Sequence, residues 1–430
     1  MYKRYEKYKD SGIEWIGEVP EHWEMKRIDW VAEYKNKGID ISNIHGNKFF
    51  YYSIPVIEET GDGKYENGGN IDSNKIVLEG DEIIISKLNP RKGRVLLTEK
   101  KELPIICSTE FVPLKPKNTD KNYLYYFYVT ETVKQYISAC VQSVTRSHQR
   151  ARPSDIVKIW SYMPTIEEQK AIANFLDHKT SEIDSLIADK EKLIKKLEEY
   201  KQSIITEAVT KGLNPDVKMK DSGIEWIGEV PEHWEIKRLK HLLEFVNIKT
   251  DNEDLPYIGL EHIESWTGKY ICPEKPSQPE NEANLFEPNY VLFGKLRPYL
   301  AKALLPDFKG RCTSELLVLR GIDLVPRYLF YNVLSKHFIN IVDSSTYGAK
   351  MPRASWQFIG NLFQVVPPID EQKSICAFLD GKIDSIDSLI KDNRNHIDVL
   401  QSYRQSLICE AVTGKIDVRD YQPERSEQLA

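Results

Sequence analysis

Residues 9–27 read KDSGIEWIGEVPEHWEMKR, and residues 220–238 read KDSGIEWIGEVPEHWEIKR. Eighteen of the nineteen positions are identical, and the exception is Met25, which stands where the second copy has Ile236. Chance does not produce such a match, so the chain contains an internal duplication. Whatever structure follows residue 27 is therefore expected again after residue 238.

A second repeat lies further along each copy. PTIEEQKAIANFLDHKTSEIDSLI at 164–187 matches PPIDEQKSICAFLDGKIDSIDSLI at 367–390, and EAVT recurs at 207–210 and 410–413. The blocks between the repeats, 28–163 and 239–366, share only short islands. The islands are DEIIISKLNP (81–90) with NYVLFGKLRP (289–298), and CSTEF (107–111) with CTSEL (312–316). This pattern indicates two homologous domains that kept a scaffold and diverged elsewhere.

We predict an α+β fold with two pseudo-symmetric α+β domains separated by two long antiparallel coiled-coil helices. In the first block, short β-rich runs such as Ile83–Lys87 alternate with Gly-Asp and Asn-Pro turns, and a helix is expected near 122–141. The expected boundaries are 1–163 for the first domain with its repeat 9–27, 164–217 for the first helix, 218–366 for the second domain with its repeat 220–238, 367–417 for the second helix, and 418–430 for a C-terminal tail.

The long helices are predicted from a heptad pattern. Apolar residues between Ile172 and Ile204 recur in steps of four and three, and the second copy keeps this register. Thr165 with Glu168 forms a capping-box pattern, and Gly212 followed by Pro215 marks the end of the first helix. A helix of ~43 residues extends ~65 Å. The two seams are expected to pack on each other, with polar seam positions such as Lys190 and Asn393 fixing the register. That these residues only fill a helical core is an equally open alternative.

The composition excludes several classes of protein. The net charge is -6, which argues against a protein that coats nucleic acid non-specifically. By segment, however, the block 28–163 carries +2 and the block 239–366 carries 0, so the excess acid lies on the helices and the tail. Apolar runs are far shorter than a membrane span, the N-terminus lacks a secretory pattern, and the six cysteines include no C-x-x-C pair. We expect a cytoplasmic protein with no membrane partner.

No catalytic motif is present. The chain has no phosphate-binding GxxxxGK[ST], no GxGxxG, no HExxH and no metal-ligand spacing, so we assign no catalytic and no metal site. The repeated Ser108-Thr109-Glu110 and Thr313-Ser314-Glu315 lack a repeated His that would act as a base. We favour a structural role for these residues over the alternative that Glu110 and Glu315 accept a hydrogen bond from a cytosine amino group.

Basic clusters in the two blocks are candidates for DNA binding, because Lys and Arg bind phosphates and Arg, Gln, Ser and His also reach base edges. In the first block they are Lys87, Arg91, Lys92, Arg94, Arg146, His148, Gln149, Arg150 and Arg152. In the second they are Lys295, Arg297, Lys302, Arg311, Lys350 and Arg353. The recurrence of Lys87 as Lys295 and of Arg150 as Arg353 favours a shared role, which scaffold salt bridges would also explain.

The repeated GIEWIGEVPEHWE carries four tryptophans: Trp15, Trp23, Trp226 and Trp234. Tryptophan is favoured at the centres of protein interfaces, so these residues are candidates for docking a partner twice. Internal packing against the long helices is an equally good explanation.

In these repeats and islands, the chain resembles the specificity subunit of type I restriction-modification systems over essentially its whole length. The resemblance implies that each α+β domain is a target-recognition domain that reads one half of a bipartite, asymmetric sequence in double-stranded DNA, while the paired helices set the spacer. It also implies no catalysis and no cofactor bound by this chain. The subunit would dock two methyltransferase subunits that use S-adenosylmethionine and, in the restricting complex, restriction subunits that use ATP and Mg. Two alternatives stay open, a coiled-coil scaffold without a nucleic-acid role and a self-contained DNA-modifying enzyme.

Overall fold

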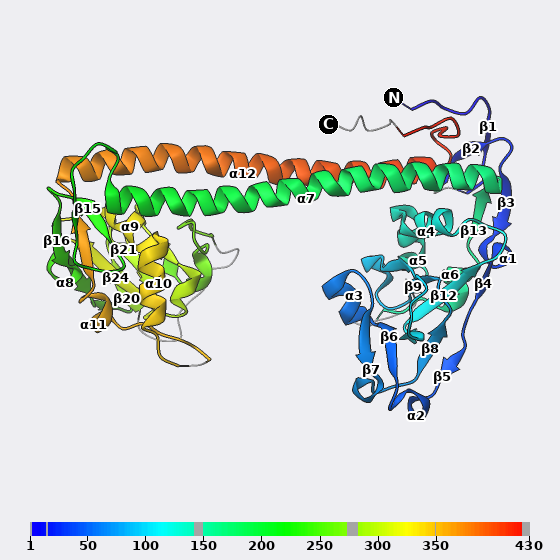
Figure 1. The fold of residues 1–430 in the computed structure, drawn as a ribbon, viewed down its shortest axis with the longest axis horizontal. Coiled ribbons are helices and arrows are strands. Elements are labelled where there is room, and N and C mark those ends of the chain that lie inside the picture. Colours follow the sequence, from blue (N-terminus) through cyan, green and yellow to red (C-terminus); the bar gives the residue numbers. More distant parts are fainter. Residues whose placement is uncertain (1, 14–15, 142–148, 273–282, 349, 424–430) are drawn as a thin grey trace. The chain divides into compact units, whose positions relative to one another are not determined.

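The computed structural model describes residues 2–13, 16–141, 149–272, 283–348 and 350–423, which form two compact units. One unit consists of Met1–Asp189 with Asn395–Ala430, and the other of Lys190–Arg394. Each unit holds one α+β domain, the beginning of one long helix and the end of the other (Figure 1).

Two sheets form the first α+β domain. One is antiparallel with the strand order β10-β9-β12-β4, and the other has the order β5-β8-β11-β6-β7 with one parallel pair, β11 with β6. Strand β9 has its three isoleucines buried, which explains why its sequence is apolar at consecutive positions rather than alternating. The strands are β4 (Ala32–Tyr34), β5 (Gly38–Ile39), β6 (Lys48–Tyr52), β7 (Lys64–Asn67), β8 (Lys75–Leu78), β9 (Ile83–Ser86), β10 (Val95–Leu97), β11 (Ile105–Ser108) and β12 (Phe111–Pro116).

The helix expected near 122–141 is two helices, α4 (Lys121–Val129) and α5 (Glu131–Ala139). The single-helix prediction was wrong because Thr130 leaves the helical conformation, with φ -59° and ψ 140°, and its side chain accepts a hydrogen bond from the Val133 N–H. Thr130 thereby caps the N-terminus of α5. Shorter helices connect the strands: α1 (Ile28–Val31), α2 (Ile41–Ile44), α3 (Ile54–Thr60) and α6 (Pro153–Val157).

The second α+β domain repeats this plan. Its sheets have the strand orders β17-β24-β21-β22 and β18-β20-β23-β19, and the pair β19 with β23 is again parallel. The strands are β17 (Leu243–Val246), β18 (Lys249–Thr250), β19 (Tyr257–Ile258), β20 (Ala283–Phe286), β21 (Val291–Gly294), β22 (Ala303–Leu304), β23 (Gly310–Cys312) and β24 (Leu316–Gly321). The helices are α8 (Leu239–Leu242), α9 (Pro326–Leu334), α10 (Lys336–Ser344) and α11 (Trp356–Ile359).

Small two-stranded sheets join each domain to the long helices. In the first unit β1 (Tyr8–Asp10) pairs with β2 (Glu18–Pro20), and β3 (Glu24–Arg27) pairs with β13 (Trp160–Met163). In the second unit β14 (Met219–Asp221) pairs with β15 (Glu229–Pro231), and β16 (Glu235–Arg238) pairs with β25 (Phe363–Val366). The two sequence repeats therefore meet, because the strand from the first repeat pairs with the strand that leads into the long helix.

The long helices are α7 (Ile166–Lys211) and α12 (Ile369–Val412). The predicted stop is confirmed, since α7 ends at Lys211 and Gly212 takes φ +76°. In the first unit Asp184 of α7 pairs with Arg404 of α12 at 3.0 Å, and in the second unit Lys201 pairs with Asp387 at 2.7 Å. Residue numbers rise along one helix as they fall along the other, so the helices are antiparallel. The predicted fold class is confirmed.

The heptad seam is buried only in part. Ile172 and Leu176 are fully buried because the first α+β domain packs against this end of α7. By contrast, Leu186 is 52% exposed and Leu193 is 44% exposed. One predicted polar contact is present, since Lys190 Nζ donates to Asn393 Oδ1 at 3.3 Å. Two helices alone cannot cover a full apolar stripe, and the uncovered part remains available for a partner.

Candidate nucleic-acid interface

A turn after β9 recurs with the same backbone after β21. Asn89 has φ 48° and ψ 62°, and Arg297 has φ 51° and ψ 61°, so both are left-handed. A short 3-10 turn follows each, η2 (Pro90–Lys92) and η4 (Pro298–Leu300). Left-handed backbone is tolerated by Asn but costs other non-glycine residues ~1–2 kcal/mol. The structure therefore builds one turn twice and places a different side chain at its left-handed position.

In each domain a later stretch of the chain comes back to this turn and holds it; we call it the returning segment, and it contains Gln149 and Arg150 in the first domain and Pro352 and Arg353 in the second. In the first, the Asn89 N–H donates to the Gln149 carbonyl at 2.7 Å, and in the second the Arg297 N–H donates to the Pro352 carbonyl at 2.8 Å. An ion pair with two-pronged geometry fastens the same segment. Arg150 pairs with Glu110 at 3.0 Å, and Arg353 pairs with Glu315 at 3.1 Å.

We call each pair a clamp, namely Glu110–Arg150 and Glu315–Arg353. The clamps favour scaffold salt bridges as the explanation of the recurring arginines, because each guanidinium group pairs with a carboxylate of its own domain. Glu110 and Glu315 are likewise occupied and are not free acceptors for a base. The structural role favoured from the sequence is thus the one the geometry supports.

The other candidate cations of the first domain divide into two groups. Lys92 and Arg94 both contact the Glu58 carboxylate, and they hold the pKa of Glu58 down at about 2. Arg152 pairs with Asp155 at 3.0 Å at the start of α6. Exposed Arg91 and half-buried Lys87, in contrast, meet no acidic side chain within the described part of the chain. Arg146 and His148 lie outside the described residues, and Gln149 is half-buried.

In the second domain, the structure corrects the assignment of Arg311 as a DNA contact. Its side chain is buried on the inner strand β23, and its guanidinium donates to the Leu255 and Glu253 carbonyls at 3.2 and 3.4 Å. A buried guanidinium that holds a loop is not on the surface where DNA binds. Lys302 is also partly occupied, because its ammonium donates to the Leu260 carbonyl at 2.6 Å.

Lys295, Arg297 and Lys350 make no ion pair with any residue that the structure describes, and Arg297 and Lys350 are exposed. Three large side chains that the sequence prediction left out are exposed in the same turn and returning segment: Tyr299 (46%), Tyr347 (67%) and Met351 (47%). Exposed aromatic residues beside unpaired cations are typical of a binding surface rather than of a solvated loop. Tyr347 and Met351 stand in the sequence YGAKMPR (347–353), from which the prediction selected only the cations Lys350 and Arg353.

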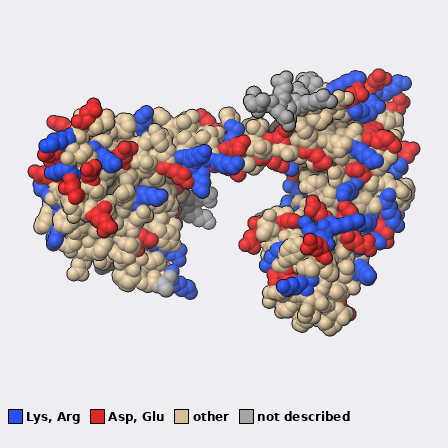
Figure 2. Space-filling model, in the orientation of Figure 1, with Lys and Arg blue, Asp and Glu red and all other residues tan. Residues whose placement is uncertain are grey.

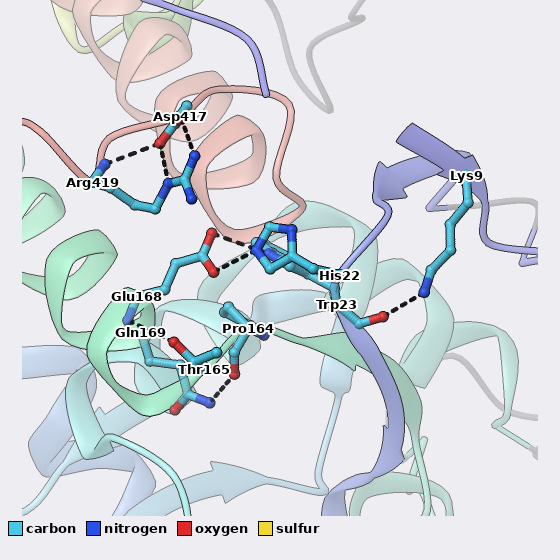
Figure 3. A network of polar contacts seen from close by, with 9 residues as sticks. All are labelled: Lys9, His22, Trp23, Pro164, Thr165, Glu168, Gln169, Asp417 and Arg419. Carbon is cyan, nitrogen blue, oxygen red and sulfur yellow. Dashed lines mark hydrogen bonds and ion pairs between the residues drawn. The ribbon is translucent and has the colours of Figure 1, made fainter. Parts of the chain in front are cut away.

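Two of the four tryptophans that were predicted to dock a partner lie in the core. Trp23 and Trp234 are each only 1% exposed, so their indole rings cannot form the centre of an interface. The Trp23 N–H donates to Glu168 of α7 at 3.1 Å, and His22 contacts the same carboxylate at 2.9 Å (Figure 3). Trp234 and His233 bind Glu371 of α12 at the same distances. Trp226 is half-buried, and Trp15 lies outside the described residues. The alternative of packing against the long helices therefore holds for Trp23 and Trp234.

The surface carries mixed charge. Figure 2 shows Lys and Arg interspersed with Asp and Glu over both units in this view. Among the described residues, no group of three His, Cys, Asp or Glu side chains is arranged to hold a metal ion. No helix of the described part combines the length and apolar character of a membrane span.

Comparison with known proteins gives the family. A family model described as the type I restriction modification DNA specificity domain matches residues 20–199. The type I restriction enzyme MjaVIII specificity subunit of Methanocaldococcus jannaschii is 24% identical over an alignment of 431 positions, which covers 94% of this chain and 95% of that protein. These matches support a type I restriction-modification specificity subunit. The MjaIX specificity subunit of the same organism is 23% identical and covers 94% of this chain and 96% of its own.

Solved structures show the same fold for this specificity subunit. A chain from a study of complex assembly and conformational transition of the type I R-M system has a TM-score of 0.71 at 16% identity, covering 92% of this chain and 98% of that chain. The HsdS subunit of Thermoanaerobacter tengcongensis has a TM-score of 0.53 at 17% identity, covering 93% and 98%. The duplicated turn and clamp are therefore parts of a specificity-subunit fold.

Proposed function

We propose that this specificity subunit reads a bipartite DNA sequence, one half-site with each α+β domain. The observation that carries the proposal is the turn-and-clamp structure built twice with the same backbone, which presents unpaired cations in both domains while its exposed side chains differ. Two domains that recognise different half-sites require the same backbone scaffold with different exposed side chains. The few unpaired cations suit local contacts and not a non-specific coat.

We further propose that the paired helices dock methyltransferase subunits and set the spacer between half-sites. Apolar side chains of α7 and α12 support this, because Leu186 and Tyr403 in the first unit and Tyr200 and Leu389 in the second are each about half exposed. An open pocket of about 590 Å³ in the first unit, lined by Asp184, Asp398 and Arg404 among others, adds polar contacts to this face. A helix of a partner would cover such a stripe.

Catalysis and cofactors are assigned to the partners. In this proposal the subunit itself is non-catalytic, and S-adenosylmethionine, ATP and Mg bind to the methyltransferase and restriction subunits. The alternative of a self-contained DNA-modifying enzyme requires that the isolated chain retain activity after every partner is removed. The alternative of a scaffold without a nucleic-acid role requires that DNA binding be absent.

The experiment is selection of bound sites from random DNA by the chain in complex with methyltransferase subunits, followed by sequencing. We expect one bipartite motif, and recovery of none refutes the proposal. In the variant Lys87→Glu/Arg91→Glu, binding should weaken strongly and lose its preference in one half-site only. The matched control, Lys48→Glu/Lys100→Glu, reverses two exposed lysines of the same domain outside the turn and should keep the motif.

A second experiment tests the spacer. Lengthening both helices equally by about one turn, ~5.4 Å, should increase the spacer and leave both half-sites unchanged. A changed base preference contradicts this part of the proposal.

A further inference from the structure

We call the turn after β9, and its counterpart after β21, the recognition turn. Its left-handed position carries different residues in the two copies. The first copy has Asn89, and the second has Arg297, whose φ of 51° is unfavourable for an arginine. Asparagine suits this backbone, whereas arginine strains it. The turn itself therefore does not call for an arginine, and the reason for Arg297 lies in what its side chain does.

The Arg297 side chain makes no hydrogen bond and no ion pair with any described residue, and it is exposed. No contact of its side chain within the described part of the chain compensates the strain of its backbone. Strained backbone that the surrounding structure holds in place clusters at functional sites, including those that bind ligands. This observation separates Arg297 from Arg353 and Arg311, whose guanidinium groups are occupied inside the domain.

The backbone beneath Arg297 is held firmly. Its N–H donates to the Pro352 carbonyl at 2.8 Å, its carbonyl accepts from the Leu300 N–H at 3.0 Å, and the next residue is the buried Pro298. A base contact requires such a fixed mount, because both hydrogen bonds must meet the base edge at once. Lys295 and Lys350 sit on the same turn and returning segment, and flexible ammonium groups suit phosphates.

We propose that Arg297 is a specificity-determining residue that binds the O6 and N7 atoms of a guanine in the half-site read by the second domain. The inference rests on the proposed function, since it names the base contact of that same surface. Arginine presents a planar fork of N–H donors that matches these two acceptors in the major groove. The half-site of the second domain therefore contains at least one G·C pair whose guanine is read by this residue.

The test compares Arg297→Asn with the wild-type chain, both in complex with methyltransferase subunits. Asparagine copies the residue of the first domain at the same backbone conformation, so the variant should melt at the same temperature or higher. Binding is measured on the selected site and on its variants with each base at each half-site position. Discrimination for guanine at one position of the second half-site should fall about 5- to 150-fold, which corresponds to about 1–3 kcal/mol at 1.4 kcal/mol per factor of ten.

The control is Arg320→Asn, which removes the same charge from an exposed arginine on β24 that pairs with Glu244. It should leave every base preference intact. The inference is overturned if Arg297→Asn weakens binding equally for all sequences, which indicates a phosphate contact, if no preference changes, or if the second half-site contains no guanine. Failure of the wild-type complex to select any bipartite motif refutes the proposed function instead.

Discussion

Replacing Trp23 by Phe removes the indole N–H that lies 3.1 Å from the Glu168 carboxylate, and Trp234→Phe removes its counterpart at Glu371. Both tryptophans are 1% exposed, so the apolar surface lost is nearly the same in the two variants. The carboxylates differ. The Glu168 side chain is 4% exposed, whereas that of Glu371 is 28% exposed. The pair of variants therefore isolates the effect of burial on one hydrogen bond.

The expected cost follows from this difference. A hydrogen bond to a charged group contributes about 1.5–3 kcal/mol, and a buried carboxylate that loses a donor cannot replace it with water. Glu168 is covered by the terminal segments, since Tyr5 packs against Trp23 with ring centroids 6.2 Å apart and Arg419 lies over Tyr5. Trp23→Phe should therefore cost ~1.5–3 kcal/mol beyond the loss of packing, while Trp234→Phe should cost roughly 0.5–1.5 kcal/mol because water reaches Glu371.

Hydrogen exchange measured by mass spectrometry is the appropriate assay, because the chain forms two units and a single unfolding free energy is not defined for it. Protection in the first turns of α7, near residues 168–176, should fall about 10-fold more in Trp23→Phe than protection near 371–379 falls in Trp234→Phe. Equal losses at the two sites, or a larger loss at α12, refute the reasoning from burial.

Three further outcomes test the site. Arg353→Gln should leave the salt dependence of DNA binding unchanged, because Arg353 pairs with Glu315 and not with a phosphate. Lys350→Gln should reduce the slope of the logarithm of the binding constant against the logarithm of the salt concentration by about one. Equal slopes for the two variants contradict the assignment of the clamp. Arg311→Ala should lower the stability of the second unit by about 1–3 kcal/mol, measured as lost hydrogen-exchange protection of β23, because two carbonyls lose their donor. A change in the selected DNA motif would place Arg311 in the interface after all. Burial raises the pKa of Asp387, but hydrogen bonds from Lys201 and Lys269 outweigh this and leave it below its ordinary 3.8. The stabilisation by Asp387 is therefore complete above about pH 4 and is lost as the pH falls through the lowered pKa. Asp387→Asn should lower the hydrogen-exchange protection of the second unit at pH 7 and make that protection less dependent on pH in acid. An unchanged dependence on pH contradicts this.

The sequence predicts the framework well for a physical reason. The long helices follow from an uninterrupted heptad pattern, and Gly212 ends α7 where a left-handed residue is needed. The break at Thr130 was missed because a β-branched residue between two helical segments is compatible with one continuous helix until its side chain is seen to cap the next. Local patterns thus predict elements, but they leave the use of individual side chains undetermined.

The candidate interface was harder to predict, because its outcome depends on partners distant in sequence. Arg94 is neutralised by Glu58, 36 residues away, and Arg353 by Glu315, 38 residues away. Arg311 stands in KGRC, which carries no apolar signal, yet β23 is an inner strand and the side chain is buried. A list of cations from the sequence therefore mixes scaffold residues with those left for a ligand, and only the fold separates them.

This separation explains how an acidic chain can read DNA. Within the described residues, Glu58, Glu110, Asp155 and Glu315 each pair with one arginine of the two domains, so the net charge of the domains says little about their affinity for DNA. Of the described cations that were predicted to bind DNA, those without an ion pair or a side-chain hydrogen bond inside the domain lie on the recognition turn (Lys87, Arg91, Lys295 and Arg297) and, in the second domain, also on its returning segment (Lys350). Their number is too small to hold DNA by charge alone, so we expect binding to depend also on base contacts and on partner subunits. The same arrangement lets positions such as 89 and 297 differ without disturbing the turn, because the clamp and the backbone hydrogen bonds that hold it use other atoms.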